Sequence, residues 1–115
     1  DRLVNTSEFF IHHEDVRRAQ PGWEPRVLDA GLDDALWSML ARTVRFTTRS
    51  SPVGITVVGP DGSRVVGNDA SPGVVLSGPP GELALFLSGR QAHSLAVVDG
   101  PDDAVAAARS ASFGI

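Results

Sequence analysis

The sequence predicts an α+β fold in which helices cover a small antiparallel or mixed sheet. Three observations support this fold class. Apolar residues recur at helical spacing in residues 28–45, and β-branched runs separated by turn residues follow in residues 53–76. Helical and extended segments then alternate in residues 80–111. This succession is typical of an α/β layer domain, in which helices bury their apolar faces against a sheet.

A further helix is expected before this layer domain. Asn5 is a favourable N-cap, and Glu8 three positions later completes a capping-box pattern. Pro21 and Gly22 end the helix, because proline cannot continue it. Trp23 follows in an irregular connector, where we expect it to pack on a neighbouring surface, with stacking on a ligand as the alternative. The predicted divisions are a helix at residues 1–20, a linker at residues 21–26 and an α+β domain at residues 27–115.

The α+β domain is expected to begin with a helix within residues 28–45. Asp29 or Asp33 can cap this helix, and Arg45 near its end complements the helix dipole. Apolar residues at helical spacing predict a stripe that packs into the core. The stripe contains Leu32, Leu36, Met39 and Leu40.

A β-hairpin is predicted next. Residues 53–58 are rich in β-branched side chains, which favour a strand, and residues 63–66 return as its partner. Residues 59–62 form the turn, with Pro60 preset for the second position and Gly62 for the last. A third short strand is expected at residues 74–76.

The last third of the chain predicts a helix, a strand and a helix. The first helix begins at Pro80 and ends at Gly89, with one apolar face. Residues 93–98 predict a strand, and residues 104–111 predict the last helix, which Asp102 and Asp103 precede. The apolar face contains Leu83, Phe86 and Leu87, and the side chains expected to fold back onto the core are Phe113 and Ile115.

Composition narrows the function classes. The chain has 115 residues, 42% of them hydrophobic, which fits one globular domain with a modest core. The formal charge of −4 argues against nucleic-acid binding, which needs a basic patch. No apolar run has the length of a membrane span. The absence of cysteine excludes disulfides and thiolate chemistry by the chain itself, and we expect a cytoplasmic protein. Because the sequence begins at Asp1, we expect a fragment or processed product.

The first helix carries the candidate chemical site. Glu8 and His12 are four positions apart, and Asp15 lies one turn further on the same side. A carboxylate and an imidazole in this arrangement can hold a divalent metal ion. Glu8 could instead act only in the capping box, and His12 could be an interior or interface histidine. A complete site needs a third ligand, for which His93 is a weak candidate because its strand position favours packing.

The segment from Glu8 to Ala19, which reads EFFIHHEDVRRA, resembles the last bundle helix of a known family. The family comprises actinobacterial proteins related to mycothiol-dependent maleylpyruvate isomerase, which have a DinB-like metal-binding bundle. The segments GELALFLSGR at residues 81–90 and VVDG at residues 97–100 resemble the C-terminal domain of these proteins, which is similar to sterol-carrier-protein-2 folds. The resemblance spans nearly the whole chain but only the C-terminal half of the family's architecture.

The resemblance implies a zinc site and a thiol cofactor. Glu8 and His12 correspond to the family's metal ligands, and Asp15 to a supporting residue. The remaining ligand, a histidine, belongs to a bundle helix that this sequence lacks. Zinc would activate mycothiol for attack on an electrophilic substrate. The resemblance therefore implies the C-terminal part of a metal- and thiol-dependent isomerase or transferase, which we expect to be inactive by itself.

A non-catalytic role is the alternative. The chain would then be an interaction domain, or would hold a small apolar molecule between its helices and sheet. Phe9, Phe10 and Ile11 on the first helix need burial, which predicts contact with the parent protein's helical bundle or with a second subunit in a homodimer.

Overall fold

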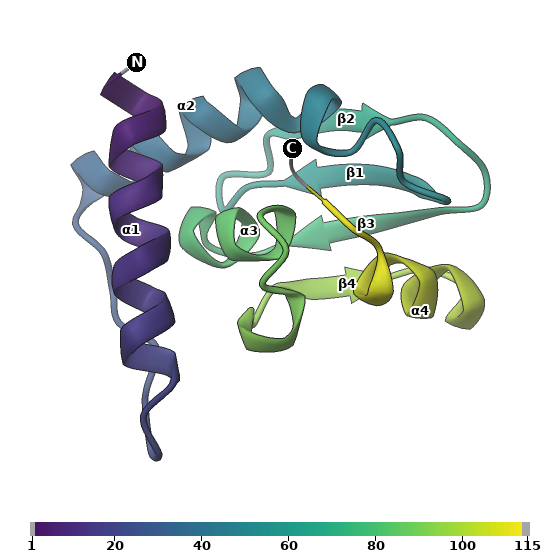
Figure 1. Ribbon diagram of the computed structural model, residues 1–115. Helices are drawn as coiled ribbons and strands as arrows, with labels where there is room; N and C mark the ends of the chain where they lie inside the picture. The colour runs from purple at the N-terminus through teal and green to yellow at the C-terminus, as the bar shows by residue number, and fades with distance from the viewer. Residues whose placement is uncertain (1, 114–115) are drawn as a thin grey trace.

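The structure is a computed structural model that describes residues 2–113, with side chains from Asn5 onward (Figure 1). Helices and a small sheet form the body of the molecule, and the N-terminal helix stands at one side of it. The elements in chain order are α1 (Arg2–Arg18), α2 (Ala30–Thr47), β1 (Gly54–Val58), β2 (Arg64–Asn68), β3 (Gly73–Ser77), α3 (Pro80–Leu87), a 3₁₀ turn (Gln91–His93), β4 (Val97–Asp99) and α4 (Asp102–Ser110).

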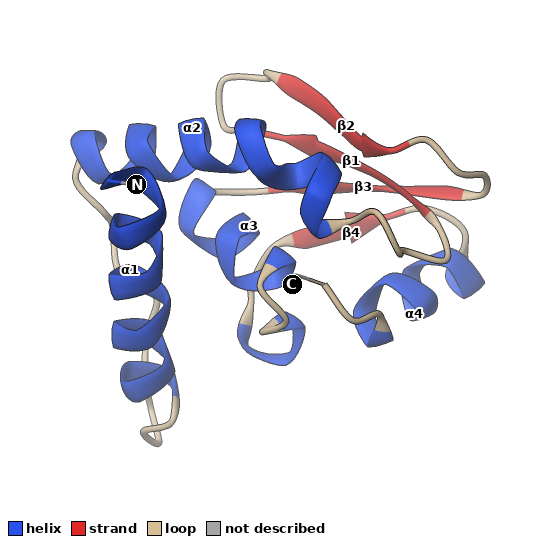
Figure 2. Cartoon of the chain, turned by 45° about the horizontal axis from the view of Figure 1, so that its top comes forward, coloured by secondary structure: helices blue, strands red, loops and turns tan. Residues whose placement is uncertain are grey.

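The strands form a mixed four-stranded sheet in the order β2-β1-β3-β4 (Figure 2). β1 pairs antiparallel with β2 and parallel with β3, and β3 pairs antiparallel with β4. The predicted hairpin and third strand are therefore confirmed. The loop after β2 passes closely over the start of β1, where a Cβ on Gly54 would collide with the carbonyl oxygen of Ala70. Glycine at this position lets β3 begin beside β1.

One face of the sheet carries the core. Ile55 and Val57 of β1 lie beside Val74 and Leu76 of β3, and all four side chains are buried. The residues that follow each of them along the strands are half-buried, as expected for a sheet covered on one face; they are Thr56, Val58, Val75 and Ser77. α2 packs against β2 and α3, and α4 packs against β3.

α2 agrees closely with the helix predicted from the sequence. Asp29 caps it by accepting a hydrogen bond from the backbone N–H of Leu32 at 2.9 Å. Leu36 and Leu40 of the predicted stripe are buried, and Leu32 and Met39 pack against the core at its margin. The predictions of the cap and of the apolar stripe are confirmed.

The predicted start of the first helix is wrong. α1 begins at Arg2, so Asn5 lies inside the helix and is not its N-cap. Residues 2–4 contain neither glycine nor proline, and nothing in the backbone interrupts the helical hydrogen bonds there. The capping-box role considered for Glu8 falls with this correction.

The predicted strand at residues 93–98 is also wrong, except at its end. Residues 91–93 form a 3₁₀ turn, and β4 begins only at Val97. Side chains already accept hydrogen bonds from the backbone N–H groups that a longer strand would use for pairing. Glu82 Oε1 accepts a hydrogen bond from the N–H of Leu95 at 2.8 Å, and the Ser94 hydroxyl accepts one from the N–H of Ala96 at 3.1 Å.

α3 is more buried than an amphipathic pattern predicts. All of its residues, from Pro80 to Leu87, are buried, and Glu82 is the charged one among them. Phe113 packs on Phe86 with ring centroids 5.9 Å apart, which confirms that the C-terminal segment folds back. Ile115 lies outside the described residues. Among the described helices, none is long and apolar enough to cross a membrane.

Candidate functional site

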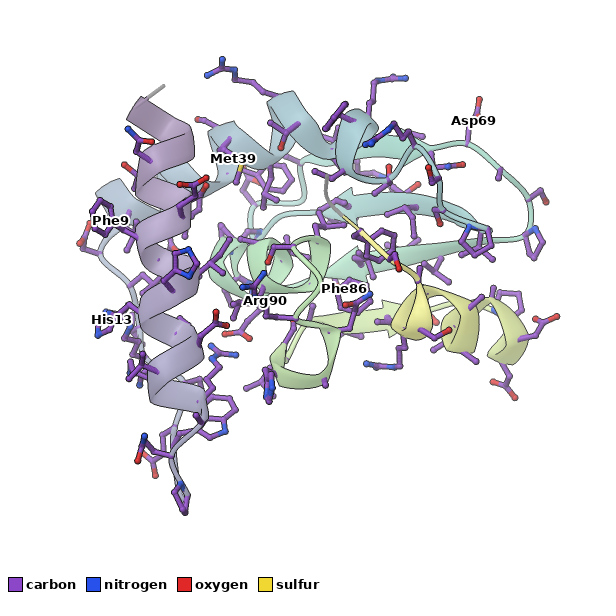
Figure 3. All side chains as sticks on the ribbon, viewed as in Figure 1. Phe9, His13, Met39, Asp69, Phe86 and Arg90 are labelled. Atoms are coloured by element: carbon purple, nitrogen blue, oxygen red, sulfur yellow. The ribbon has the colours of Figure 1, made fainter. Side chains whose placement is uncertain are left out.

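The outer face of α1 carries the residues predicted to bind a metal. Glu8 and His12 are exposed on the continuous helix, and Asp15 is partly exposed. Asp15 lies near His12, with Oδ2 3.9 Å from Nδ1. Phe9 and Val16 are 79% and 66% exposed on the same helix. Figure 3 shows Phe9 and His13 on the side of α1 that points away from the body of the protein.

Glu8 and His12 do not form a complete metal site in this chain. Within residues 2–113, no group of three or more histidine, aspartate or glutamate side chains is placed to hold a metal ion. His93 therefore does not join Glu8 and His12. Structural and catalytic zinc sites use at least three protein ligands. Any zinc site that used this helix would need its remaining ligands from outside the described residues.

Asp15 is held by a residue from the other end of the fold. Arg90 donates to both carboxylate oxygens of Asp15, at 3.2 Å from Nε and 3.0 Å from Nη2. The Nη1 group of Arg90 also donates to the carbonyl oxygen of Ser88, which follows α3, at 2.8 Å. Arg90 therefore binds a carbonyl at the C-terminal end of α3 and pairs with an acid of α1. This contact fixes the outer face of α1 relative to α3.

The inner face of α1 carries a buried charge cluster that sequence reasoning missed. We call Glu14, Arg18 and Glu82 the buried triad; they are 1%, 5% and 8% exposed. Arg18 donates to both oxygens of Glu82 at 2.7 Å, and its Nε donates to Glu14 Oε1 at 3.1 Å. Arg18 Nη1 also donates to the carbonyl oxygen of His93 at 2.6 Å. One guanidinium thus joins α1, α3 and the 3₁₀ turn.

The buried triad is ionised. Burial raises the pKa of Glu14, but hydrogen bonds from Arg17 and Arg18 outweigh burial and hold that pKa below its ordinary value. Burial acts in the same way on Glu82, and its bonds to Arg18 and to the N–H of Leu95 lower the pKa overall. The hydrogen bonds of Arg18 to Glu82 and to Glu14 raise the pKa of Arg18, although burial acts to lower it.

The linker packs back along α1 through arginine side chains. Arg17 Nη2 donates to the carbonyl oxygen of Glu24 at 2.7 Å, and Arg26 Nε donates to Glu14 Oε2 at 3.0 Å. The guanidinium of Arg18 lies 4.4 Å from the centroid of the Trp23 ring, a cation–π contact. The prediction that Trp23 packs against a neighbouring surface is confirmed.

A pocket of about 490 Å³ lies between the inner face of α1, the linker and the start of α3. Its wall includes Phe10, Leu28 and Leu95 as well as the buried triad. It is separate from Glu8 and His12, neither of which lines it. Sequence reasoning expected an apolar site between helices and sheet, and this pocket lies instead beside α1.

Two signals in the sequence could have revealed the buried triad. Phe10, Glu14 and Arg18 are spaced four apart, so the face that buries Phe10 must also carry the other two. Glu82 is the single charged residue in an otherwise apolar helix, PGELALFL. A lone charge in such a helix needs a partner of opposite charge. The pairing across 64 positions could not be read from the spacing.

Comparisons of this chain with protein-family models, with curated proteins and with solved structures found no match.

Proposed function

We propose that this chain is the C-terminal portion of a DinB-like metalloprotein of the mycothiol-dependent type, in which α1 presents Glu8 and His12 to a helical bundle outside the chain. The observation that supports the proposal is the exposure of these two side chains one turn apart on α1. Exposed Phe9 and Val16 on the same helix offer apolar surface for the bundle. The chain alone is inactive in this proposal, because its described residues hold two ligands.

The chemistry proposed for the assembled site follows from its ligands. Carboxylate and imidazole suit a divalent ion, and zinc is the ion proposed. When bound, zinc would lower the pKa of a coordinated thiol such as mycothiol. Asp15 would support His12 in the assembled site, because its Oδ2 lies 3.9 Å from His12 Nδ1 and Arg90 holds Asp15 in place. A reducing compartment keeps such a thiol free, so the proposal includes a cytoplasmic location. It also includes a C-terminal domain of the sterol-carrier-protein-2 type, as the resemblance of residues 81–90 and 97–100 implies.

The partner surface differs from the one expected from the sequence. Phe10 is 5% exposed and belongs to the chain's own core, and Ile11 is half-buried against that core. Among the described side chains of α1, Phe9 and Val16 are therefore the exposed apolar ones that a partner would cover. The partner proposed is the parent protein's bundle, with a second copy of the chain as the other arrangement.

Nickel titration followed by NMR tests the ligand assignment. Ni²⁺ binds imidazole and broadens nearby signals, so weak binding by two ligands is still visible. We expect the His12 ring signals to broaden before those of His13 and His93. Glu8→Ala should weaken the apparent affinity about tenfold, and His12→Ala should remove the preferred site.

His13→Ala is the matched control, because His13 is also exposed on α1 but lies toward Arg26, 3.2 Å from its Nη2. This variant should bind nickel as the parent chain does. Equal broadening of all three histidines, or an affinity unchanged by Glu8→Ala, would show that Glu8 and His12 do not act together.

A further inference from the structure

The pocket beside α1 has the size and composition of a small-molecule site. Its volume of about 490 Å³ falls within the range of about 300–1,000 Å³ that such sites occupy. The side chains of Phe10, Leu28 and Leu95 give it an apolar wall, which Pro25 and Pro79 extend. A ligand with an apolar body would therefore be desolvated on several sides.

The negative charges of the two acids in the buried triad are already paired with arginine side chains. Glu14 accepts hydrogen bonds from Arg17, Arg18 and Arg26, so both of its oxygens are occupied. Glu82 accepts from Arg18 and from the N–H of Leu95. Neither carboxylate requires a cation from a ligand, and the Arg18 guanidinium is committed to both of them.

Arg26 is the most exposed charged residue of the wall. Its side chain is 36% exposed. Its hydrogen bonds to residues with described side chains use Nε, toward Glu14, and Nη2, toward His13. A guanidinium carries five N–H donors, and those on Nη1 take part in neither of these bonds. The guanidinium carbon also lies 5.9 Å from the centroid of the Phe10 ring, which places the charge beside the apolar wall.

The remaining acid of the wall is Asp33, which comes from α2. It also lines the neighbouring hollow together with Trp37 and Pro60. Partial burial raises the pKa of Asp33, and the nearby charges of Asp34 and Asp29 raise it further. This carboxyl group is therefore protonated more readily than an ordinary aspartate. The positive end of the pocket is thus Arg26.

We propose that this pocket binds a small carboxylate with an apolar ring or chain, whose carboxylate pairs with Arg26 and whose body lies on Phe10, Leu28 and Leu95. A charge-assisted bond to a guanidinium supplies orientation, and the apolar wall supplies the burial. The site is distinct from the Glu8 and His12 face, so it stands or falls independently of the metal proposal.

The test compares three naphthalene derivatives of matched size that bear a carboxylate, a hydroxymethyl group or an aminomethyl group. Binding to the full chain is measured by NMR from the methyl signals of Leu28 and Leu95. We expect the carboxylate to bind about tenfold more tightly than the alcohol, and the amine to bind least well.

Variants at Arg26 sharpen this comparison. Arg26→Gln should reduce the affinity for the carboxylate to that for the alcohol and leave the affinity for the alcohol unchanged. Arg26→Lys should retain part of the preference, because the charge remains without the planar fork. Arg64→Gln, which changes an exposed arginine on β2, is the control and should bind as the parent chain does. Equal affinities for the three compounds, tighter binding of the amine, or unshifted Leu28 and Leu95 methyl signals would each overturn the proposal.

Discussion

The two faces of α1 reverse the usual arrangement of an amphipathic helix. The inner face buries Glu14 and Arg18 beside Phe10, whereas the outer face exposes Phe9 and Val16. A helix at a protein surface normally turns its apolar side inward. Here the inner face is held by hydrogen bonds between charges, and within the described residues no buried side-chain nitrogen or oxygen lacks a partner. The comparison shows that paired charges hold α1 on the body together with the apolar contact of Phe10.

The difference also separates two kinds of residue on one helix. The inner face is complete, since each buried charge meets an opposite charge from the linker, α3 or α1 itself. The outer face offers Glu8 and His12 without the further ligands that zinc requires. Stability should therefore depend on the inner face, and binding to an outside partner on the outer face.

The largest expected effect comes from breaking the buried triad. Arg18→Met keeps much of the apolar stem of the side chain. It leaves Glu82 buried without its arginine partner, and Glu14 with Arg17 and Arg26 as its remaining partners. Breaking a buried pair on one side costs about 3–5 kcal/mol, so we expect urea unfolding to show a loss of that order. The control is Arg17→Met, which leaves Glu14 paired with Arg18 and Arg26 and should cost about 1 kcal/mol or less. Similar losses in the two variants would contradict the central role of Arg18.

A slightly smaller effect should separate two adjacent phenylalanines. Phe10→Ala should lower the free energy of unfolding by about 3 kcal/mol, because Phe10 is 5% exposed and packs closely on Gly81 of α3. Phe9→Ala should change it by less than about 0.5 kcal/mol, because Phe9 is 79% exposed. Equal losses, measured by urea unfolding, would mean that Phe9 is buried in solution and that the two faces do not differ.

The smallest expected effect is a dependence of stability on pH. The folded-state pKa values of Glu14 and Glu82 lie below their ordinary values, so the unfolded chain binds protons first as pH falls. Their stabilising contribution is fully present above the ordinary glutamate pKa. It is lost as pH falls below that value and through the lowered pKa of each group. The urea midpoint should therefore drop between about pH 5 and pH 3.

The variant with both Glu14→Gln and Glu82→Gln isolates this effect. It should be less stable at pH 7 and should show a flatter midpoint between pH 5 and pH 3. The raised pKa of Arg18 adds nothing in this range, since arginine stays protonated throughout it. If the urea midpoint of the variant fell as steeply with pH, other carboxylates would be responsible for the acid sensitivity.

Much of the α+β body could be predicted from local pattern. The spacing of Leu36 and Leu40 predicts the buried stripe of α2, and Asp29 predicts its cap. The β-branched run and the turn at Gly62 predict the hairpin, because such signals act over a few residues. The strand predicted at His93 failed because the side chains of Glu82 and Ser94 accept hydrogen bonds from the backbone N–H groups of Leu95 and Ala96. Strand propensity contains nothing about those partners.

The candidate sites divide in the same way. That Glu8, His12 and Asp15 share one side of a helix follows from the helical period alone. The sequence did not show that Arg90 holds Asp15 or that Arg18 joins Glu82, because these pairs lie 75 and 64 positions apart. The pocket beside Arg26 likewise needs the linker to lie against α1.

The sequence by itself determined the order of the main helices and strands, the hairpin with its turn, and the apolar stripe of α2, because local spacing and turn chemistry set these features. The tertiary structure alone decided which face of α1 is buried. In isolation both faces of that helix carry charged and aromatic side chains. The inner face is chosen because Glu82 on α3 and Arg26 on the linker supply charges that complement it, and such pairing depends on positions brought together only by folding.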